Sequence, residues 1–235
     1  MKPASLLLLL GAGLFAQAPQ PPQAPAAAPR PDGLYAIFKT SMGNITIQLY
    51  EKVTPNTVRN FVGLAQGTKA WMDPKTKTLV KRPLYNNTIF HRVMLDQMIQ
   101  GGDPTGKGDH DCGVKIRDEI VPTLNFDRPG RLAMANTGEK DSGGCQWFIT
   151  QVTVPHRAGW DGAYTIFGQV IEGQDVVKAI SRAPGRRLPE PEGGIRPNDP
   201  PKLVSVEIQR VGPAPAAPAA KKAAPAKKTP DPAKQ

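Results

Sequence analysis

Hydrophobic and polar residues alternate along several short segments of the chain, and this alternation predicts half-buried β-strands. Ile45, Ile47 and Leu49 are separated by Thr46 and Gln48, so one face of this segment is apolar and the other is polar. About eight segments are predicted as strands, at residues 34–39, 45–49, 88–93, 98–100, 131–135, 147–151, 165–171 and 202–211. Turn-forming residues separate them, so the strands are short.

Two segments have helical spacing instead. The first follows Thr54, a good N-cap residue, begins at Pro55 and ends before Gly67. Its apolar stripe consists of Val58, Phe61, Val62, Leu64 and Ala65. The second helix spans residues 174–181. Because strands and helices do not alternate regularly, the order of elements favours an antiparallel barrel or sandwich whose ends are covered by helices.

The connecting segments are mostly polar. Residues 68–82 are rich in lysine and predict an excursion with a short hairpin, and residues 105–113 predict a long glycine-bearing loop. The stretch GGDPTGKG at residues 101–108 comes close to a phosphate-binding loop. Gly108 stands where that loop needs a hydroxyl group, and no helix follows, so nucleotide binding is not predicted.

Both ends of the chain are too rich in proline and alanine to form a core. The expected organisation is a signal peptide at residues 1–18, a disordered Pro/Ala-rich linker at 19–33, one folded domain at 34–211 and a disordered Ala/Pro/Lys-rich tail at 212–235. The folded part, about 180 residues, is long enough for one well-buried domain.

The first residues predict export from the cytoplasm. Lys2 precedes an apolar run from Leu6 to Ala16, which is too short for a membrane span of about 20 residues. A small-x-small pattern places the cleavage site after Ala18, with cleavage after Ala16 as the alternative because Pro19 is a poor residue there. The mature protein is then periplasmic or secreted. The competing interpretation is an apolar, disordered N-terminus on a cytosolic protein.

The net charge of +10 does not predict nucleic-acid binding. Five lysines and one aspartate in the tail account for +4 of it, and the basic residues of the folded part form no stripe interleaved with aromatic residues. The tail is either a solvated spacer or a weak contact to an anionic envelope surface.

The only two cysteines, Cys112 and Cys145, lie in glycine-flanked segments. In an exported protein they could form a disulfide or remain as two thiols, and the sequence leaves both states open. The three histidines, His91, His110 and His156, are not at metal-ligand spacing. A hydrolase or a metal-dependent enzyme therefore has little support, and no cofactor or metal is predicted.

Four blocks of sequence carry a resemblance to a known family. Residues 90–103, FHRVMLDQMIQGGD, closely resemble the cyclophilin signature. Residues 132–138 (LAMANTG), 146–150 (QWFIT) and 161–168 (DGAYTIFG) are similar to three further cyclophilin blocks in the same order, and the resemblance runs from about residue 35 to 210. It implies a closed eight-stranded antiparallel barrel capped by two helices, and peptidyl-prolyl cis–trans isomerase activity.

The resemblance also implies a site without a nucleophile. Arg92 is the expected catalytic residue, Phe148 and Met98 the floor of a proline pocket, and Gln100 the residue that orients Arg92. The backbone of Asn136 is expected to bind the substrate residue before proline. The substrate-binding residues implied in this way are Phe90, Gln97, Met98, Gln100, Ala135, Asn136, Gln146, Phe148, Trp160 and Tyr164.

The chain departs from the family pattern at three places. Gln97 stands where the family usually has a phenylalanine that forms a wall of the proline pocket. The loop at residues 138–146 is longer than usual, so the pocket beside the substrate residue that precedes X-Pro is expected to differ. The segment at residues 152–159 is also longer, so Trp160 corresponds either to the tryptophan that lines the groove or to the leucine after it. A loop tryptophan packed only for stability is a third interpretation of Trp160.

Two functional hypotheses follow. The first is a monomeric isomerase that assists the folding of exported proteins and acts on unfolded or flexible polypeptides that contain proline. The second is a proline-recognising binding or chaperone module in which Gln97 has reduced turnover.

Overall fold

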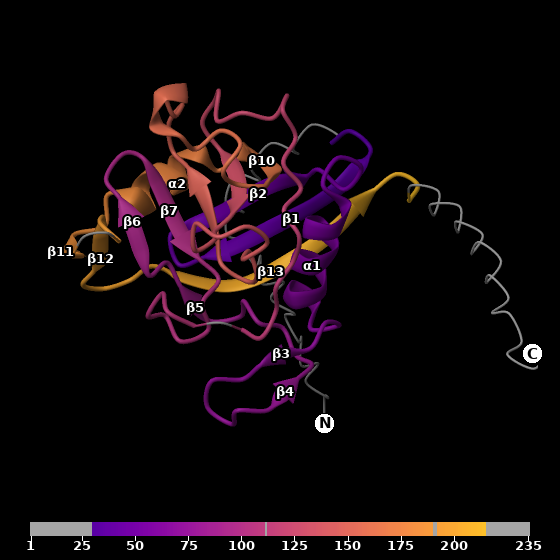
Figure 1. The fold of residues 1–235 in the computed structure, drawn as a ribbon, viewed down its shortest axis with the longest axis horizontal. Coiled ribbons are helices and arrows are strands. Elements are labelled where there is room, and N and C mark those ends of the chain that lie inside the picture. The colour runs from indigo at the N-terminus through magenta and orange to yellow at the C-terminus, as the bar shows by residue number, and fades with distance from the viewer. Residues whose placement is uncertain (1–29, 111, 190–191, 215–235) are drawn as a thin grey trace, which may run out of the picture. The chain divides into compact units, whose positions relative to one another are not determined.

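β-strands make up most of the regular structure (Figure 1), in a computed structural model that describes residues 30–110, 112–189 and 192–214. From Pro31 onward the described residues belong to one compact unit. The predicted signal peptide, the linker up to residue 29 and the tail from residue 215 lie outside the described residues.

The main sheet has eleven antiparallel strands in the order β11-β12-β6-β7-β9-β8-β10-β2-β1-β13-β5. These strands are β1 (Gly33–Thr40), β2 (Gly43–Leu49), β5 (Thr88–Ile89), β6 (Arg92–Met94), β7 (Met98–Gly101), β8 (Arg131–Met134), β9 (Trp147–Thr150), β10 (Ile166–Glu172), β11 (Gly185–Arg187), β12 (Ile195–Pro197) and β13 (Lys202–Val211). A separate two-stranded sheet, β3 (Trp71–Met72) with β4 (Leu79–Val80), is the hairpin predicted within residues 68–82.

The expected closed ring of eight strands requires correction. Its hydrogen-bonded ladder is open, because the segment expected as one strand at residues 88–93 is divided into β5 and β6. β5 pairs with β13 at one end of the ladder, whereas β6 pairs with β7 and β12. Phe90 and His91 lie between them and pair with neither partner of β6, so the sheet curls toward itself without a continuous ladder.

Among the described residues, two α-helices and one short 3₁₀ helix complete the fold. α1 (Pro55–Gln66) packs against β13, and α2 (Gln174–Ser181) packs against β2 and β7 (Figure 1). The 3₁₀ helix spans His156–Ala158. Both α-helices lie at their predicted positions, and the outward faces of both are polar.

Aromatic side chains fill the space between α1 and the curled sheet. Phe61 of α1 lies 6.0 Å from Phe38, 5.2 Å from Tyr85 and 5.4 Å from Phe167, measured between ring centroids. The ring of Trp147 in β9 lies 4.8 Å from that of Phe38, again between centroids. All five side chains are buried, and each large apolar side chain removed from water contributes about 1.5–3 kcal/mol. This core supports the strands that carry the site.

A carboxylate from a distant loop caps the N-terminus of α1. Thr54 occupies the N-cap position, as predicted, but its side chain makes no capping hydrogen bond. Instead, Glu119 accepts hydrogen bonds from the backbone N–H and the side chain of Asn56, and from the backbone N–H and hydroxyl of Thr57, at 2.8–3.1 Å. Glu119 thus satisfies the first N–H groups of the helix and places a negative charge at its positive end.

We expect Glu119→Ala to lower the free energy of unfolding by about 1–2 kcal/mol, because it removes a charged acceptor from four donors. Urea denaturation measures this as a lower midpoint with an unchanged slope. The matched control is Glu139→Ala, which removes the same charge from an exposed side chain. Equal effects of the two variants would contradict the capping role.

Candidate active site

The β6–β7 hairpin places Arg92 directly opposite Gln100. The strand register pairs the two residues, and Arg92 Nη1 donates a hydrogen bond to Gln100 Oε1 at 2.9 Å. The turn between the strands is tight, because Asp96 adopts a left-handed φ of 54° and the backbone N–H of Gln97 donates to the Met94 carbonyl at 2.9 Å. The short hairpin therefore fixes the relative position of the guanidinium and the carboxamide.

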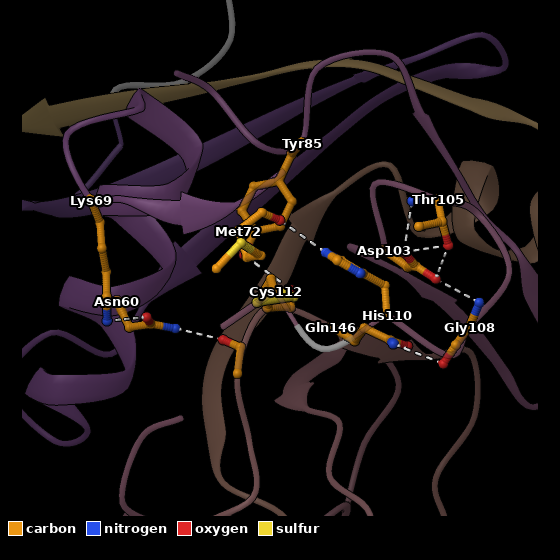
Figure 2. The surroundings of a disulfide bond; sticks show 12 residues. Asn60, Lys69, Met72, Tyr85, Asp103, Thr105, Gly108, His110, Cys112 and Gln146 are labelled. Atoms are coloured by element: carbon orange, nitrogen blue, oxygen red, sulfur yellow. Dashed lines mark hydrogen bonds between the residues drawn. A yellow bond between two sulfur atoms is a disulfide. The ribbon is translucent and has the colours of Figure 1, made fainter. Parts of the chain in front are cut away.

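The Gln100 carboxamide is held in turn by a neighbouring glutamine. Gln100 Nε2 donates to Gln146 Oε1 at 3.0 Å. Gln146 Nε2 donates in turn to the Gly108 carbonyl at 2.9 Å, as Figure 2 shows. The loop that carries Gly108 is fixed by the buried Asp103, whose Oδ2 accepts from the Gly108 N–H at 2.6 Å. Arg92 is thus the end of a chain of amide hydrogen bonds, which defines the orientation of each member.

A second set of acceptors lies on the other side of Arg92. Its Nε donates to the carbonyl of Gly193 at 3.0 Å, and Nη2 donates to the carbonyl of Glu192. These residues connect β11 to β12, a hairpin that the sequence did not predict. Each of the three guanidinium nitrogens therefore has an acceptor that the fold holds in place.

Four aromatic rings form a cluster on β9 and the loops beside it. Phe148 lies 5.8 Å from Phe126, 5.5 Å from Trp160 and 5.1 Å from Tyr164 between ring centroids. Phe126 is nearly parallel to Phe148, and the other two rings meet it edge to face, which is a favourable aromatic geometry. Met98 belongs to the same apolar cluster. Trp160 and Tyr164 are only partly buried, so the cluster reaches the surface.

A cavity of about 300 Å³ adjoins the glutamine pair. The predicted site residues that line it are Gln100, Ala135, Asn136 and Gln146. Cys112 and Cys145 also line it, and in the structure they form a disulfide with their Cα atoms 6.3 Å apart (Figure 2). The bridge therefore links two walls of the cavity, the loop of Gly108 and the segment before β9.

Known proteins with similar sequences cover nearly all of the folded part. Residues 35–210 match the family model described as cyclophilin type peptidyl-prolyl cis-trans isomerase/CLD. Peptidyl-prolyl cis-trans isomerase A of Mycobacterium tuberculosis is 44% identical over 175 residues, 74% of this chain and 91% of that protein. Peptidyl-prolyl cis-trans isomerase B of Streptomyces anulatus is 46% identical over 153 residues, 64% of this chain and 85% of that protein. The chain belongs to the cyclophilin family.

A solved cyclophilin agrees with this assignment. The crystal structure of a cyclophilin type peptidyl-prolyl cis-trans isomerase from Cryptosporidium parvum, determined in the presence of the dipeptide Ala-Pro, superposes with a TM-score of 0.61. The two sequences are 28% identical, and the match covers 75% of this chain and 99% of that one. The predicted family and the predicted isomerase class are confirmed, and the curled, mostly antiparallel sheet with two helices is a cyclophilin fold.

The cyclophilin signature residues converge, with one correction. Phe90 was expected to contact substrate, but its side chain is fully buried in the main core, 5.8 Å from the Trp147 ring. Period-two alternation would place Phe90 on the same face as Arg92. The interruption between β5 and β6 breaks this alternation, so Phe90 and Val93 both point into the core. Phe90 therefore packs in the main core beneath the curled sheet and does not line the site.

Gln97 lies in the turn of the β6–β7 hairpin and is partly buried. Its backbone carbonyl accepts from the N–H of Gln151 at 2.7 Å, whereas its side chain makes no hydrogen bond within the described residues. Sequence reasoning missed Phe126, which is the only aromatic residue between Phe90 and Trp147. A lone aromatic residue in a polar segment was the only feature of the sequence that could have indicated its place in the cluster.

His91, between the core and the site, is 1% exposed. Burial lowers its pKa to about 4, the nearby Arg196 and Arg92 charges add to the lowering, and the Asp103 carboxylate opposes it. Neither ring nitrogen makes a well-formed hydrogen bond within the described residues, although Gln146 lies close enough to favour the protonated form slightly. His91 is therefore neutral in the folded protein at physiological pH.

We expect this histidine to make folding sensitive to acid. An unfolded chain binds the proton near pH 6.5, but folded His91 binds it only near pH 4. Its stabilising contribution is complete above pH 6.5 and is lost progressively as the pH falls to 4, by about 3 kcal/mol in total. Urea denaturation across this range should show the loss, and His91→Gln should remove it. His156→Gln, at an exposed position, should not.

No group of three or more histidine, cysteine, aspartate or glutamate side chains in the described part of the chain is arranged to hold a metal ion. Nor is any helix among the described residues long and apolar enough to cross a membrane.

Proposed function

We propose that this cyclophilin accelerates the cis–trans isomerisation of X-Pro bonds in exported polypeptides, with Arg92 as the catalytic residue. The observation that carries the proposal is the pairing of Arg92 with Gln100 in a hairpin next to the aromatic cluster of Phe148. A single cation with a fixed orientation thus lies close to an apolar surface that can accept a proline ring. The protein would act as a monomer and without a cofactor.

Arg92 would act on the resonance of the amide bond. The barrier to rotation, about 18–20 kcal/mol, arises because the proline nitrogen shares its lone pair with the carbonyl group. In the twisted state the nitrogen becomes pyramidal and its lone pair is localised. An N–H of the Arg92 guanidinium can then donate a hydrogen bond to that nitrogen, which it cannot do as well in the planar ground state. Such differential binding lowers the barrier.

The remaining residues would hold the substrate while the bond rotates. Met98 and Phe148 provide the apolar floor, and the partly buried Trp160 and Tyr164 provide its edge. The backbone of Asn136 would bind the residue before proline, and the 2.8 Å hydrogen bond from its side chain to the carbonyl of Ala163 supports a fixed position for this backbone. The Cryptosporidium parvum cyclophilin crystallised in the presence of Ala-Pro supports a proline-containing substrate.

Two observations support an exported protein. The first 18 residues have the pattern of a signal peptide, and the disulfide between Cys112 and Cys145 is of a kind that persists in oxidising compartments. The clients would be unfolded or flexible chains with proline, in the periplasm or outside the cell. The lysine-rich tail would give at most a weak contact to anionic envelope surfaces.

NMR exchange spectroscopy on an Ala-Pro peptide tests the function directly. Uncatalysed exchange takes tens to hundreds of seconds, too slow for exchange peaks, so their appearance with catalytic amounts of the mature protein demonstrates turnover. Excess Ala-Pro dipeptide should suppress these peaks by competition. The proposal fails if the peptide shows binding shifts while its two isomers still exchange at the uncatalysed rate.

That outcome would favour the second function, a proline-recognising module with little turnover. The observation behind it is Gln97, whose polar side chain occupies the position of a pocket-forming phenylalanine. An amide group there offers less apolar contact to a proline ring and requires water or another partner for its own polar atoms.

Gln97→Phe distinguishes the two functions. For an enzyme that is already fast, we expect kcat to change less than threefold and KM to fall two- to fivefold, because the added ring increases the apolar contact with proline. A rise in kcat of tenfold or more with unchanged peptide affinity would show that Gln97 restrains catalysis. Leu95→Phe is the control, since it adds a ring to an exposed position in the same turn.

A further inference from the structure

The β11–β12 hairpin extends the sheet beyond β6 and contributes to the core through Leu188, Ile195 and Pro197. All three residues of β11 are exposed, and β11 pairs only with β12. β12 pairs with β6 through Ile195 and Val93, so the hairpin is attached next to Arg92. The tip of the hairpin also contacts the side chain of Arg92.

The tip of the hairpin, Glu192–Gly194, lies in direct contact with the guanidinium of Arg92. Its carbonyls at Glu192 and Gly193 accept from Nη2 and Nε respectively. Gly194 has a φ of 83°, and a β-carbon there would lie 2.9 Å from the Val93 carbonyl oxygen and 3.4 Å from Arg92 Nε. The chain can approach β6 this closely only because residue 194 has no side chain.

Fixed contacts also hold the hairpin itself. Gly194 accepts a hydrogen bond from the Leu188 N–H at 2.9 Å, which closes the hairpin near its tip. Arg196 donates to the carbonyls of Gly106 and Lys107, in the same loop whose Gly108 carbonyl binds Gln146. The loop at residues 106–108 therefore contacts both sets of acceptors, the glutamine pair and the hairpin. A shift of either set relative to Arg92 would break hydrogen bonds to this loop.

An arginine side chain has many rotamers, and a catalytic cycle would otherwise lose this rotamer entropy each time the guanidinium is ordered on the substrate. Gln100 accepts a hydrogen bond only from Nη1, and this single contact still allows the guanidinium plane to rotate about it. The two carbonyls bind the opposite edge of the same planar group. Together, the three acceptors define both the position and the plane of the guanidinium before substrate arrives, which is the condition for electrostatic preorganisation.

We propose that the tip of the β11–β12 hairpin is a positioning element for Arg92. It acts through backbone carbonyls and does not touch substrate. The proposal rests on the catalytic role of Arg92 given above. Its chemical consequence is specific. Loss of the tip contacts lowers kcat, because the guanidinium is misoriented in the twisted state. It leaves KM nearly unchanged, because no residue of the tip belongs to the apolar cluster of Met98 and Phe148.

Gly194→Ala tests the proposal, because the new β-carbon must push the tip away from Val93 and Arg92. We expect kcat to fall five- to twentyfold and KM to change less than twofold. Gly212→Ala is the matched control: it introduces the same left-handed strain, at a φ of 72°, at the far end of β13. The three atoms nearest to its β-carbon all belong to the exposed Asp32 side chain. This variant should leave kcat unchanged.

The Arg92→Ala background separates positioning from general damage. In that background Gly194→Ala should change kcat/KM less than twofold, because the tip has no guanidinium left to orient. A fall as large as in the wild type would overturn the proposal. An increase in turnover of the single variant would also overturn it, since it would mean that the tip competes with substrate for Arg92. Should Gly194→Ala not fold, Arg196→Ala loosens the same tip and should lower kcat two- to fivefold.

A measurement without substrate keeps the two proposals distinguishable. The Nε–H of Arg92, bonded to the Gly193 carbonyl, should give a protected ¹H–¹⁵N signal in the free protein. The signal is assigned by its absence in Arg92→Ala. We expect it to exchange rapidly with solvent in Gly194→Ala. A protected signal without turnover would reject the proposed function and retain the positioning, whereas normal turnover with an unprotected signal would reject the positioning alone.

Discussion

Arg92→Ala is expected to lower kcat/KM for X-Pro isomerisation by two to three orders of magnitude while the protein remains folded. Removal of one well-placed donor to a developing charge typically costs a factor of 10²–10³, about 3–4 kcal/mol of transition-state stabilisation. The loss should appear mainly in kcat, since the aromatic floor at Phe148 and Met98 is intact. A protease-free NMR or proline-limited refolding assay measures it.

Two further variants make this result interpretable. Arg92→Lys keeps the charge but not the planar fork, so it cannot bond Gln100 and the two backbone carbonyls together, and we expect it to recover less than a tenth of the wild-type rate. Arg59→Ala removes an exposed arginine of α1 and should retain full activity. If Arg92→Ala keeps kcat/KM within threefold of the wild type, Arg92 is not the catalytic residue.

Much of the fold was predictable because period-two alternation is a strong signal. The pattern at residues 45–49 specifies a strand with one buried face, and β2 is found there. The hairpin of β11 and β12 was missed for the opposite reason. Residues 185–187 have no apolar face to bury, and the surrounding prolines and glycines read as a loop. Its strands form through backbone pairing, β11 with β12 and β12 with β6, which leaves no hydrophobic pattern.

The open ladder of hydrogen bonds shows a second limit of prediction from the sequence. Residues 88–93 have the composition of one continuous strand, and that interpretation implied an unbroken ring. The chain instead passes from pairing with β13 to pairing with β7 in the space of Phe90 and His91. This change of partner depends on the curvature of the whole sheet, which no local pattern encodes. The expectation that Phe90 contacts substrate was wrong for the same reason.

The candidate site was predicted from family resemblance, because its residues come from separate segments. Periodicity alone gives no reason to place Gln100, Gln146 and Asn136 around one cavity. Even the resemblance could not predict the carbonyls of Glu192 and Gly193 at Arg92. These contacts use backbone carbonyls, which every residue has, so the residue types at these positions do not indicate a contact with Arg92.

Removal of the disulfide should have the largest effect on stability. Cys112 and Cys145 are 33 residues apart, and in the chain-entropy model a cross-link over such a loop stabilises the folded state by roughly 3–4 kcal/mol. We therefore expect Cys112→Ala/Cys145→Ala to lower the free energy of unfolding by that amount and the melting temperature by about 10 °C. Reductant should destabilise the wild type and leave the double variant unchanged, which is the internal control.

The same variant should separate stability from catalysis. Without the bridge, the walls of the cavity keep other attachments: Asn60 donates to the Gly144 carbonyl at 2.7 Å, Tyr85 donates to the Cys145 carbonyl at 3.1 Å, and Gln146 still binds Gly108 (Figure 2). We expect kcat at low temperature to stay within threefold of the wild type. A loss of less than 1 kcal/mol would mean that these hydrogen bonds, and not the bridge, hold the cavity. A tenfold loss of kcat in the folded variant would instead make the disulfide a part of the catalytic architecture, and the activity of the enzyme would then depend on the redox state of its compartment.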